Sequence, residues 1–452
     1  MRPRYHSMTT QAQAAVGKLS LAVRRPWLVL AVLIAATYAG VLNRQLLTLS
    51  TETIKTELHL SDMRVGVIMG LVPGLVTGIG SLFFGALADR APRHYVLAGS
   101  ILFWSLATAG LGISGSVIGI TLGVAALALG ESGLGPIVNA IIPDLFREQR
   151  RVLANFITSA AGAMALGIAT IMAGLLMGFV EANRSGFPVS LAMIPNWKLS
   201  FLLAAALGLP VAAAVLGIGK LPSTDEGAQA ASESIGQYVR RHGIVLLGLS
   251  GCFAMQGLGS AAYLSWFPSY LVRRFGMNPA DVGPLLGIVI LCGSLFGLLV
   301  TFGATRWLYA RLKHGSPYLL YRFALLAAVV PTLALLIAPT AHVALGLLFC
   351  MLALVAGAGG HIPTILQGLI PGRFRGRIFG AITLLMGLIP ALGPSLVGAI
   401  SDYIGSPSMG LIGGICAVTT VAFVLAGLLM HLIYKSAVLA AADIRHQSNS
   451  LC

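Results

Sequence analysis

The chain has 452 residues, of which 57% are hydrophobic and 10% are charged, and its mean hydropathy is +0.89. Soluble domains carry about 25% charged residues, so this composition excludes a soluble multidomain enzyme. Repeated apolar runs of roughly 20 residues, each able to cross a ~30 Å hydrocarbon core as a helix, predict an all-α membrane protein. A net charge of +15 would suggest nucleic acid in a soluble protein; here it indicates loop charges, and no nucleic-acid partner is expected.

Hydropathy divides the chain into twelve predicted spans, in two sets of six. They are Trp27–Leu49, Val65–Ala88, Tyr95–Ser114, Val117–Phe146, Val152–Val180, Leu199–Gly219, Ile244–Val272, Val282–Leu308, Tyr318–Ala338, Val343–Ile370, Ile378–Ile404 and Met409–Tyr434. The predicted organisation is therefore an N-terminal segment (1–26), a first half (27–219), a polar linker (220–243), a second half (244–435) and a C-terminal tail (436–452).

Basic residues are distributed unequally between the two sides of the predicted bundle. Of the 29 Lys and Arg residues, 22 fall on the side of the N-terminus, six fall on the opposite side, and Arg44 lies inside a span. The positive-inside rule then places both termini and the linker in the cytoplasm.

The end of the second span carries a recognisable motif. GALADRAPRH (Gly85–His94) resembles the G-x-L-x-D-R-x-x-R signature of the major facilitator superfamily of transporters. The resemblance implies two six-helix halves that rock around a central cavity, with a charged cytoplasmic latch that forms and breaks. We assign that latch to Gly85, Asp89, Arg90, Arg93, Asp144 and Arg150. The alternative for the motif is a plain positively charged turn.

A second stretch narrows the resemblance. LGESGLGPIVNAIIPDLFREQRR (Leu129–Arg151) resembles the fourth span and following loop of bacterial spinster-like lipid transporters. That family typically has an Asp-Arg pair in its first span; Arg44 matches, but Asn43 stands at the aspartate position. Asparagine cannot carry a proton, so this chain either relies on Glu131 alone or carries an engineered substitution that mimics a protonated carboxyl. Organic-anion symporters of the same superfamily share similar features and remain an alternative.

Two residues that are charged at neutral pH lie well inside predicted spans: Glu131 in the fourth and Arg44 in the first. An ionised side chain at the bilayer centre costs roughly 2.5–3.5 kcal/mol, so neither should face lipid. In the superfamily architecture these spans line the central cavity, where the two side chains could face each other. We expect Glu131 to carry the coupling proton, with Arg44 and Asn43 beside it, unless Arg44 and Glu131 form a permanent structural pair. Arg44 could also bind an anionic headgroup.

The second half lacks a buried charge at mid-membrane, so its predicted cavity surface is mostly apolar. Candidate cavity residues from both halves are Tyr38, Asn139, Gln256, Tyr263 and His361. A helix-contact histidine is the simpler interpretation of His361. Trp266 could line the cavity beside Tyr263, but an interfacial aromatic belt explains it equally well. GLGPI (Gly133–Ile137) and GHIPT (Gly360–Thr364) are glycine-proline interruptions, which can bend during transport or kink for packing.

The resemblance to the spinster-like family implies a proton-coupled transporter of a lysophospholipid- or sphingolipid-like amphiphile, working by alternating access. We expect a monomer in a bacterial inner membrane. The alternatives are an organic-anion or multidrug transporter on the same fold, and a membrane-embedded lipid enzyme. One carboxylate and one arginine supply no nucleophile-base-orienter set, so the enzyme is disfavoured. No metal-ligand spacing or phosphate-binding loop occurs in the sequence, and no cofactor is expected. Membrane lipids are the expected surroundings.

Overall fold

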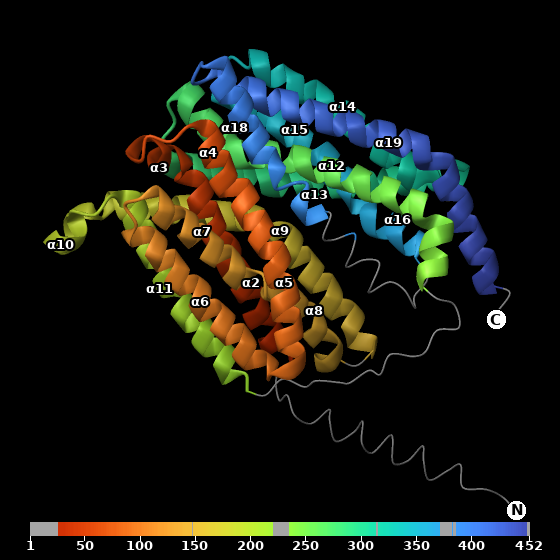
Figure 1. Ribbon diagram of the computed structural model, residues 1–452, viewed down its shortest axis with the longest axis horizontal. Helices are drawn as coiled ribbons and strands as arrows, with labels where there is room; N and C mark the ends of the chain where they lie inside the picture. Colours follow the sequence, from red (N-terminus) through yellow and green to blue (C-terminus); the bar gives the residue numbers. More distant parts are fainter. Residues whose placement is uncertain are drawn as a thin grey trace, which may run out of the picture.

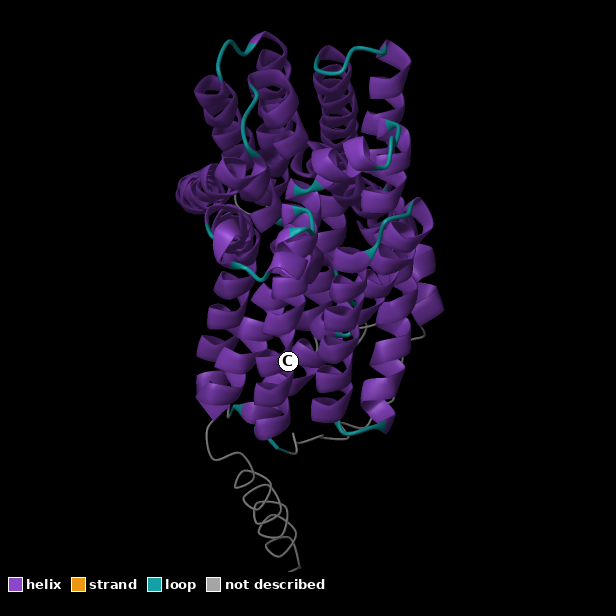
Figure 2. Cartoon of the chain, turned by 90° about the vertical axis from the view of Figure 1, so that its left-hand side faces the viewer, coloured by secondary structure: helices purple, strands orange, loops and turns teal. Residues whose placement is uncertain are grey.

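The computed structural model describes residues 26–146, 148–219, 235–312, 315–370, 382 and 386–449. Every regular element in these ranges is a helix, and none of them forms a strand (Figure 2). Eleven of the helical segments are long and apolar enough to cross a membrane. The predicted all-α, multi-span fold class is thus confirmed.

The first half contains the helices from α2 to α11. Their bounds are α2 Pro26–Leu49, α3 Thr51–Glu57, α4 Asp62–Gly66, the π-helical η1 Val67–Leu71, α5 Val72–Arg90, α6 Arg93–Ile113, α7 Val117–Glu131, α8 Leu134–Leu145, α9 Glu148–Ala182, the 3-10 turn η2 Arg184–Gly186, α10 Val189–Ala192 and α11 Asn196–Gly217.

The second half contains the helices from α12 to α19. Their bounds are α12 Ile235–Phe275, α13 Pro279–Leu312, α14 Ser316–Ala334, η4 Leu335–Ile337, α15 Ala341–Gly360, α16 Ile362–Leu369, α18 Leu392–Ile404 and α19 Met409–Asn449. Helix α12 begins nine residues before the predicted seventh span, and α19 continues fifteen residues beyond the predicted twelfth.

The fourth predicted span is interrupted, which is why eleven long spans are found where the sequence predicts twelve. Helix α7 ends at Glu131, the chain turns at Ser132 and Gly133, and α8 begins at Leu134. A proline at position 136 has no N–H to donate to the carbonyl four residues earlier, which disfavours a continuous helix. The tenth span is broken in the same way at His361, two residues before Pro363. The predicted interruptions at GLGPI and GHIPT are therefore real breaks in helices.

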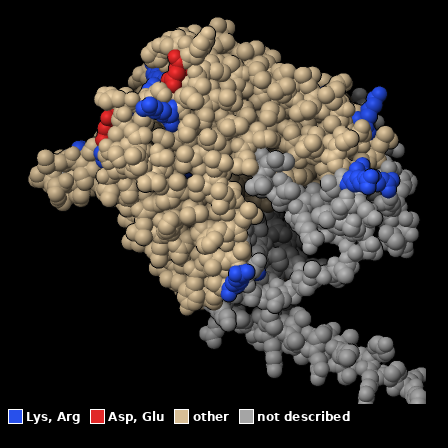
Figure 3. All heavy atoms as spheres, viewed as in Figure 1, with Lys and Arg blue, Asp and Glu red and all other residues tan. Residues whose placement is uncertain are grey.

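The two halves meet near one end of the bundle and diverge toward the other (Figure 1). We call the end at which α2 begins the Pro26 end, and the opposite end, at which α2 finishes, the Leu49 end. Charged side chains of the described residues gather near the ends and leave a broad uncharged band between them on the visible face (Figure 3). Such a band is the surface that a hydrocarbon core requires.

Glycines allow the halves to touch backbone to backbone at the Leu49 end. On one side α9 crosses α13, where a Cβ on Gly167 would lie 2.8 Å from the Gly287 carbonyl oxygen. On the other side η1 crosses the start of α18, where a Cβ on Gly70 would lie 2.6 Å from the Ala391 carbonyl oxygen. Any larger residue would push these helices apart, so the seams depend on small residues as membrane helix contacts commonly do.

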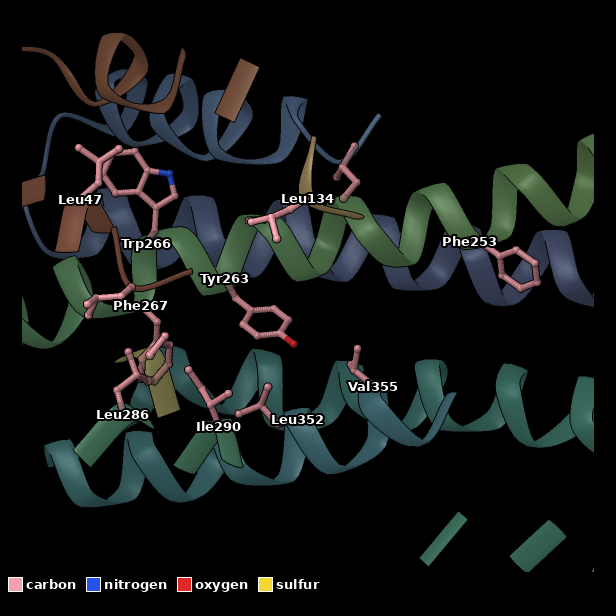
Figure 4. Packing of buried hydrophobic residues seen from close by; sticks show 14 of the residues in the cluster. Leu47, Leu134, Phe253, Tyr263, Trp266, Phe267, Leu286, Ile290, Leu352 and Val355 are labelled. Atoms are coloured by element: carbon pink, nitrogen blue, oxygen red, sulfur yellow. The ribbon is translucent and has the colours of Figure 1, made fainter. Parts of the chain in front are cut away.

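The apolar core is continuous across the two halves. Leu47 of α2 and Trp266 of α12 lie together in Figure 4, and both are buried. Trp266 also donates its indole N–H to the Pro394 carbonyl at 2.9 Å, which ties α12 to α18 within the second half. These contacts close the bundle between the candidate site and the Leu49 end.

Candidate functional site

The structure brings Arg44 and Glu131 together at mid-bundle. Arg44 of α2 donates from Nη2 to Oε2 of Glu131, the last residue of α7. Glu131 packs against Gly40 of α2, where a Cβ would lie 3.7 Å from the glutamate Cγ. The break after α7 ends the helix at this glutamate, and the missing side chain at Gly40 leaves it room against α2. Local sequence thus places the carboxylate beside the guanidinium.

The two members of this pair differ in environment. The Glu131 side chain is 8% exposed, whereas the Arg44 side chain is 56% exposed. The second carboxylate oxygen, Oε1, is buried and has no hydrogen-bond partner among the described residues. Arg44 therefore donates one hydrogen bond to a buried acid, while more than half of its side chain stays accessible. Five N–H donors on that group leave capacity for a further anion.

Asn43 does not share this environment. Its side chain is buried, and its carbonyl oxygen Oδ1 has no hydrogen-bond partner among the described residues. Neighbouring residues on a helix point about 100° apart, so Asn43 turns into the protein as Arg44 turns toward open space. An aspartate at position 43 would therefore be buried, in surroundings different from those of Arg44.

A cavity of about 180 Å³ lies between α2, α8 and α9, and its lining begins near the ion pair along the chain. Leu134 follows Glu131 by three residues, and Tyr38 precedes Arg44 by six, about 9 Å along the helix axis. The cavity is lined by Leu30, Leu33, Ile34, Thr37, Tyr38, Leu134, Gly135, Val138, Thr158, Ala161 and Gly162. Its wall is apolar apart from three hydroxyl groups. Tyr38 is one of the residues that line this cavity, and its contact with a substrate stays a prediction.

The candidate cavity residues of the second half are buried polar side chains, unlike the exposed Arg44 of the first half. Gln256 donates to the Val355 carbonyl at 3.1 Å, and its own Oε1 has no partner among the described residues. His361 is 5% exposed at the helix break, with Nε2 also unpartnered in the described part of the chain. Tyr263 is only 1% exposed and lies between α12 and the helix that carries Val355 (Figure 4). In this state Tyr263 contacts protein, and so does not line an open cavity.

The residues that the sequence analysis assigns to the latch lie at the Pro26 end of the bundle. Arg90 ends α5, Arg93 begins α6, and the exposed Arg150 lies in the first turn of α9. The side chains of Asp89 and Asp144, like that of the cavity candidate Asn139, lie outside the described part of the structure, and so does any contact they make. Gly85 belongs to α5.

A second charged cluster, absent from the predicted site, joins the halves at the Leu49 end. Arg273 of α12 binds both carboxylate oxygens of Asp62 at 2.6 and 2.7 Å, and it also binds Glu52 at 2.8 Å. Lys55 donates to Asp62 as well. The Arg273 and Asp62 side chains are 7% and 5% exposed, so this contact is shielded from solvent. We call these residues, with Ser401 and Asp402, the outer clamp.

Helix α18 completes the outer clamp from the second half. Ser401 donates its hydroxyl to Asp62 at 2.6 Å. Asp402 accepts the backbone N–H groups of Asp62 and Met63, at 2.9 and 2.8 Å, at the start of α4. A carboxylate there is favoured by the free N–H groups and partial positive charge of a helix N-terminus. The clamp thus spans the seam between α4 and α18.

The sequence does not predict the outer clamp. Arg273 and Lys55 enter the charge count only as loop cations, and Asp62 and Asp402 stand 340 residues apart. Glu57 extends the charged surface within the first half, accepting from Trp197 Nε1 and Lys198 Nζ, both at 2.8 Å. Burial acts to raise the pKa of Glu57, but these two hydrogen bonds outweigh it and leave the pKa below its usual value.

Comparisons with known proteins agree with this architecture. The chain is 24% identical over 424 residues to an MFS-type efflux pump of Mycolicibacterium smegmatis, covering 87% of this chain and 92% of that one. It is 22% identical over 409 residues to the hexuronate transporter of Bacillus subtilis, covering 85% and 92%.

Solved structures show the same fold. A bacterial homologue of the human lysosomal transporter Spinster, in an inward-facing and unoccupied conformation, superposes with a TM-score of 0.70 at 20% identity, over 93% of this chain and 97% of the other. The nucleoside transporter NupG superposes with a TM-score of 0.68 at 11% identity, over 90% and 99%.

Residues 28–394 match the family described as Major Facilitator Superfamily. With its membrane-spanning helices and bacterial relatives, the protein is an integral multi-pass protein of the inner membrane. The chain belongs to the Major Facilitator Superfamily, whose fold and activity are those of membrane transporters.

Proposed function

We propose that this transporter moves an anionic amphiphile of the lysophospholipid or sphingolipid type, coupled to protons. The observation that carries the proposal is the pair of Arg44 and Glu131 at mid-bundle, with an exposed Arg44 side chain and an apolar cavity nearby. An anionic headgroup fits the free donors of Arg44, and an acyl chain fits the wall of the cavity. Membrane lipids surround a protein that acts as a monomer.

Proton coupling follows from competition for Arg44. While Glu131 is ionised it holds the guanidinium; when Glu131 is protonated, the charge attraction disappears and Arg44 can pair with the headgroup instead. Protonation of Glu131 and binding of an anion at Arg44 therefore favour each other. Mutual preference of this kind makes proton and anion travel in the same direction.

The orientation comes from the basic residues. Since 22 of the 29 lie on the N-terminal side, we assign the Pro26 end to the cytoplasm. The outer clamp then closes the external side, and the open space at Arg44 connects to the cytoplasm. Release of the outer clamp and closure of the bundle at the Pro26 end would expose the site to the other side.

A small organic anion is the second candidate substrate, and the relatives support it. The hexuronate transporter of Bacillus subtilis and the probable L-galactonate transporter of Escherichia coli are similar to this chain over 85% and 60% of its length. A carboxylate alone would satisfy Arg44 without using the apolar cavity. The cavity is therefore the feature that separates the two substrates.

The test uses purified protein in liposomes with an imposed proton gradient, inside alkaline. Uptake of a fluorescent lysophospholipid and of radiolabelled hexuronate is measured side by side, for wild type and Thr158→Phe, which fills the cavity. We expect gradient-driven lysophospholipid uptake that the phenylalanine removes. Hexuronate uptake that Thr158→Phe leaves intact, without lysophospholipid uptake, would assign the protein to the organic-anion transporters.

A further inference from the structure

An arginine and a histidine are paired on the outside of the second half, away from the transport site. Arg322 of α14 donates from Nη1 to Nδ1 of His431 in α19 at 2.6 Å. Both residues lie inside candidate membrane spans. Their neighbours Phe323 and Leu432 are 56% and 73% exposed, so this face of the two helices is an apolar surface that lipid covers.

Among the residues that the structure describes, the Arg322 guanidinium has no acidic partner. Apart from His431, its neighbour within the described residues is the Phe323 ring, 4.6 Å from Cζ. Helix α14 contains no acidic residue, and the only one in α19 is Asp443, twelve residues and about 18 Å beyond His431. A cation in a membrane span without a counter-charge is costly, so the surroundings must supply an anion.

Further donors lie close to Arg322. Because Nδ1 of His431 accepts the arginine proton, the imidazole proton sits on Nε2, where it can be donated. Lys435 follows His431 by four residues, lies on the same side of α19, and is exposed. The three residues therefore form a basic site with donors from two helices.

Depth places this basic site at the level of lipid headgroups. Arg322 is the seventh residue of α14, about 9 Å along the axis from its start. The Tyr434 hydroxyl lies against Gly315 at the N-cap of α14, and its ring makes an edge contact with Tyr318. The candidate span also begins at Ser316, so the start of α14 marks this side of the membrane, and the long side chain of Arg322 can extend toward it.

We propose that Arg322, His431 and Lys435 bind the phosphate of an anionic phospholipid, such as phosphatidylglycerol, in the leaflet at the Pro26 end. The guanidinium would pair with two phosphate oxygens, and Lys435 would supply the second charge. The acyl chains lie on the apolar surface around Phe323 and Leu432. The site lies on the lipid-facing surface, so its test is independent of transport activity.

The experiment measures thermal unfolding of the full chain in a mild detergent while phosphatidylglycerol, phosphatidylcholine or inorganic phosphate is added. We expect phosphatidylglycerol alone to raise Tm. Arg322→Gln should raise the lipid concentration for half-maximal stabilisation by about fivefold, and Lys435→Gln should act in the same direction if the first variant folds poorly. Arg64→Gln, which removes an exposed arginine at the Leu49 end, is the matched control and should change nothing.

Three outcomes would overturn the proposal. The first is an equal response to phosphatidylcholine, which lacks net charge. The second is an equal response to inorganic phosphate, which would make this a free-anion site. The third is an unchanged phosphatidylglycerol response in both Arg322→Gln and Lys435→Gln.

Discussion

Replacing Arg273 by glutamine should open the Leu49 end of the transporter. Arg273 makes two hydrogen bonds to Asp62, and one hydrogen bond and an ion-pair contact to Glu52, all shielded from solvent. Removing one member of a buried ion pair costs about 3–5 kcal/mol, because the remaining charge stays buried. Lys55 still neutralises Asp62, so we take the lower figure of about 3 kcal/mol. The charges regain water when the clamp opens, so the closed-to-open ratio should fall about a hundredfold.

Electron-electron resonance distances between spin labels would report this opening. The labels go on His59→Cys in the first half and Tyr403→Cys in the second, both exposed beside the outer clamp, in a background without other exposed cysteines. Arg273→Gln should add or enlarge a long-distance population. Arg274→Gln is the control, because Arg274 makes no hydrogen bond to an acidic group among the described residues and donates to the Met409 sulphur, at 3.8 Å. Identical distance distributions in wild type and Arg273→Gln would refute the assignment of the clamp.

Three further predictions follow from individual contacts. The pKa of Glu57 is lowered in the folded protein, so its stabilising contribution is present above the unfolded pKa of about 4.3 and is lost as pH falls through the folded value. The difference in Tm between wild type and Glu57→Gln should therefore shrink on acidification. A difference that stays constant with pH would contradict this. Gly66→Ala places a methyl group against the Pro394 carbonyl, and this overpacking costs about 1–3 kcal/mol. The distance between the labels at positions 59 and 403 should therefore lengthen. An unchanged distance would show that the seam adapts to the methyl group. Asn43→Asp should shift the pH profile of transport, and an unchanged profile would exclude this position from coupling.

The sequence predicts the fold well because long apolar runs and the positions of basic residues are local features. Hydropathy locates the spans, and the prolines at 136 and 363 mark the two helix breaks. The pairing of Arg44 with Glu131 is also foreseeable, since two charges inside spans must find each other or water.

The outer clamp could not be predicted in the same way. Its members lie near span ends, where single charged residues are common, and nothing local pairs Asp62 with Arg273 or Asp402. Burial also depends on how the helices pack, which places Tyr263 in the core between α12 and α15 and buries Asn43 while its neighbour Arg44 stays exposed. Such outcomes depend on how two distant helices cross, which periodicity does not encode.

The central claim is that Glu131 couples protons to transport, and Glu131→Gln tests it most directly. Glutamine keeps the size of the side chain and permanently removes the negative charge, so Arg44 should remain free to bind substrate. In liposomes we expect Glu131→Gln to exchange substrate across the membrane in the absence of a gradient, but to accumulate none when a pH gradient is imposed. Glu181→Gln, which removes an exposed carboxylate bonded to Asn278 at the Leu49 end, should accumulate substrate like wild type. Gradient-driven accumulation that survives in Glu131→Gln would contradict the account.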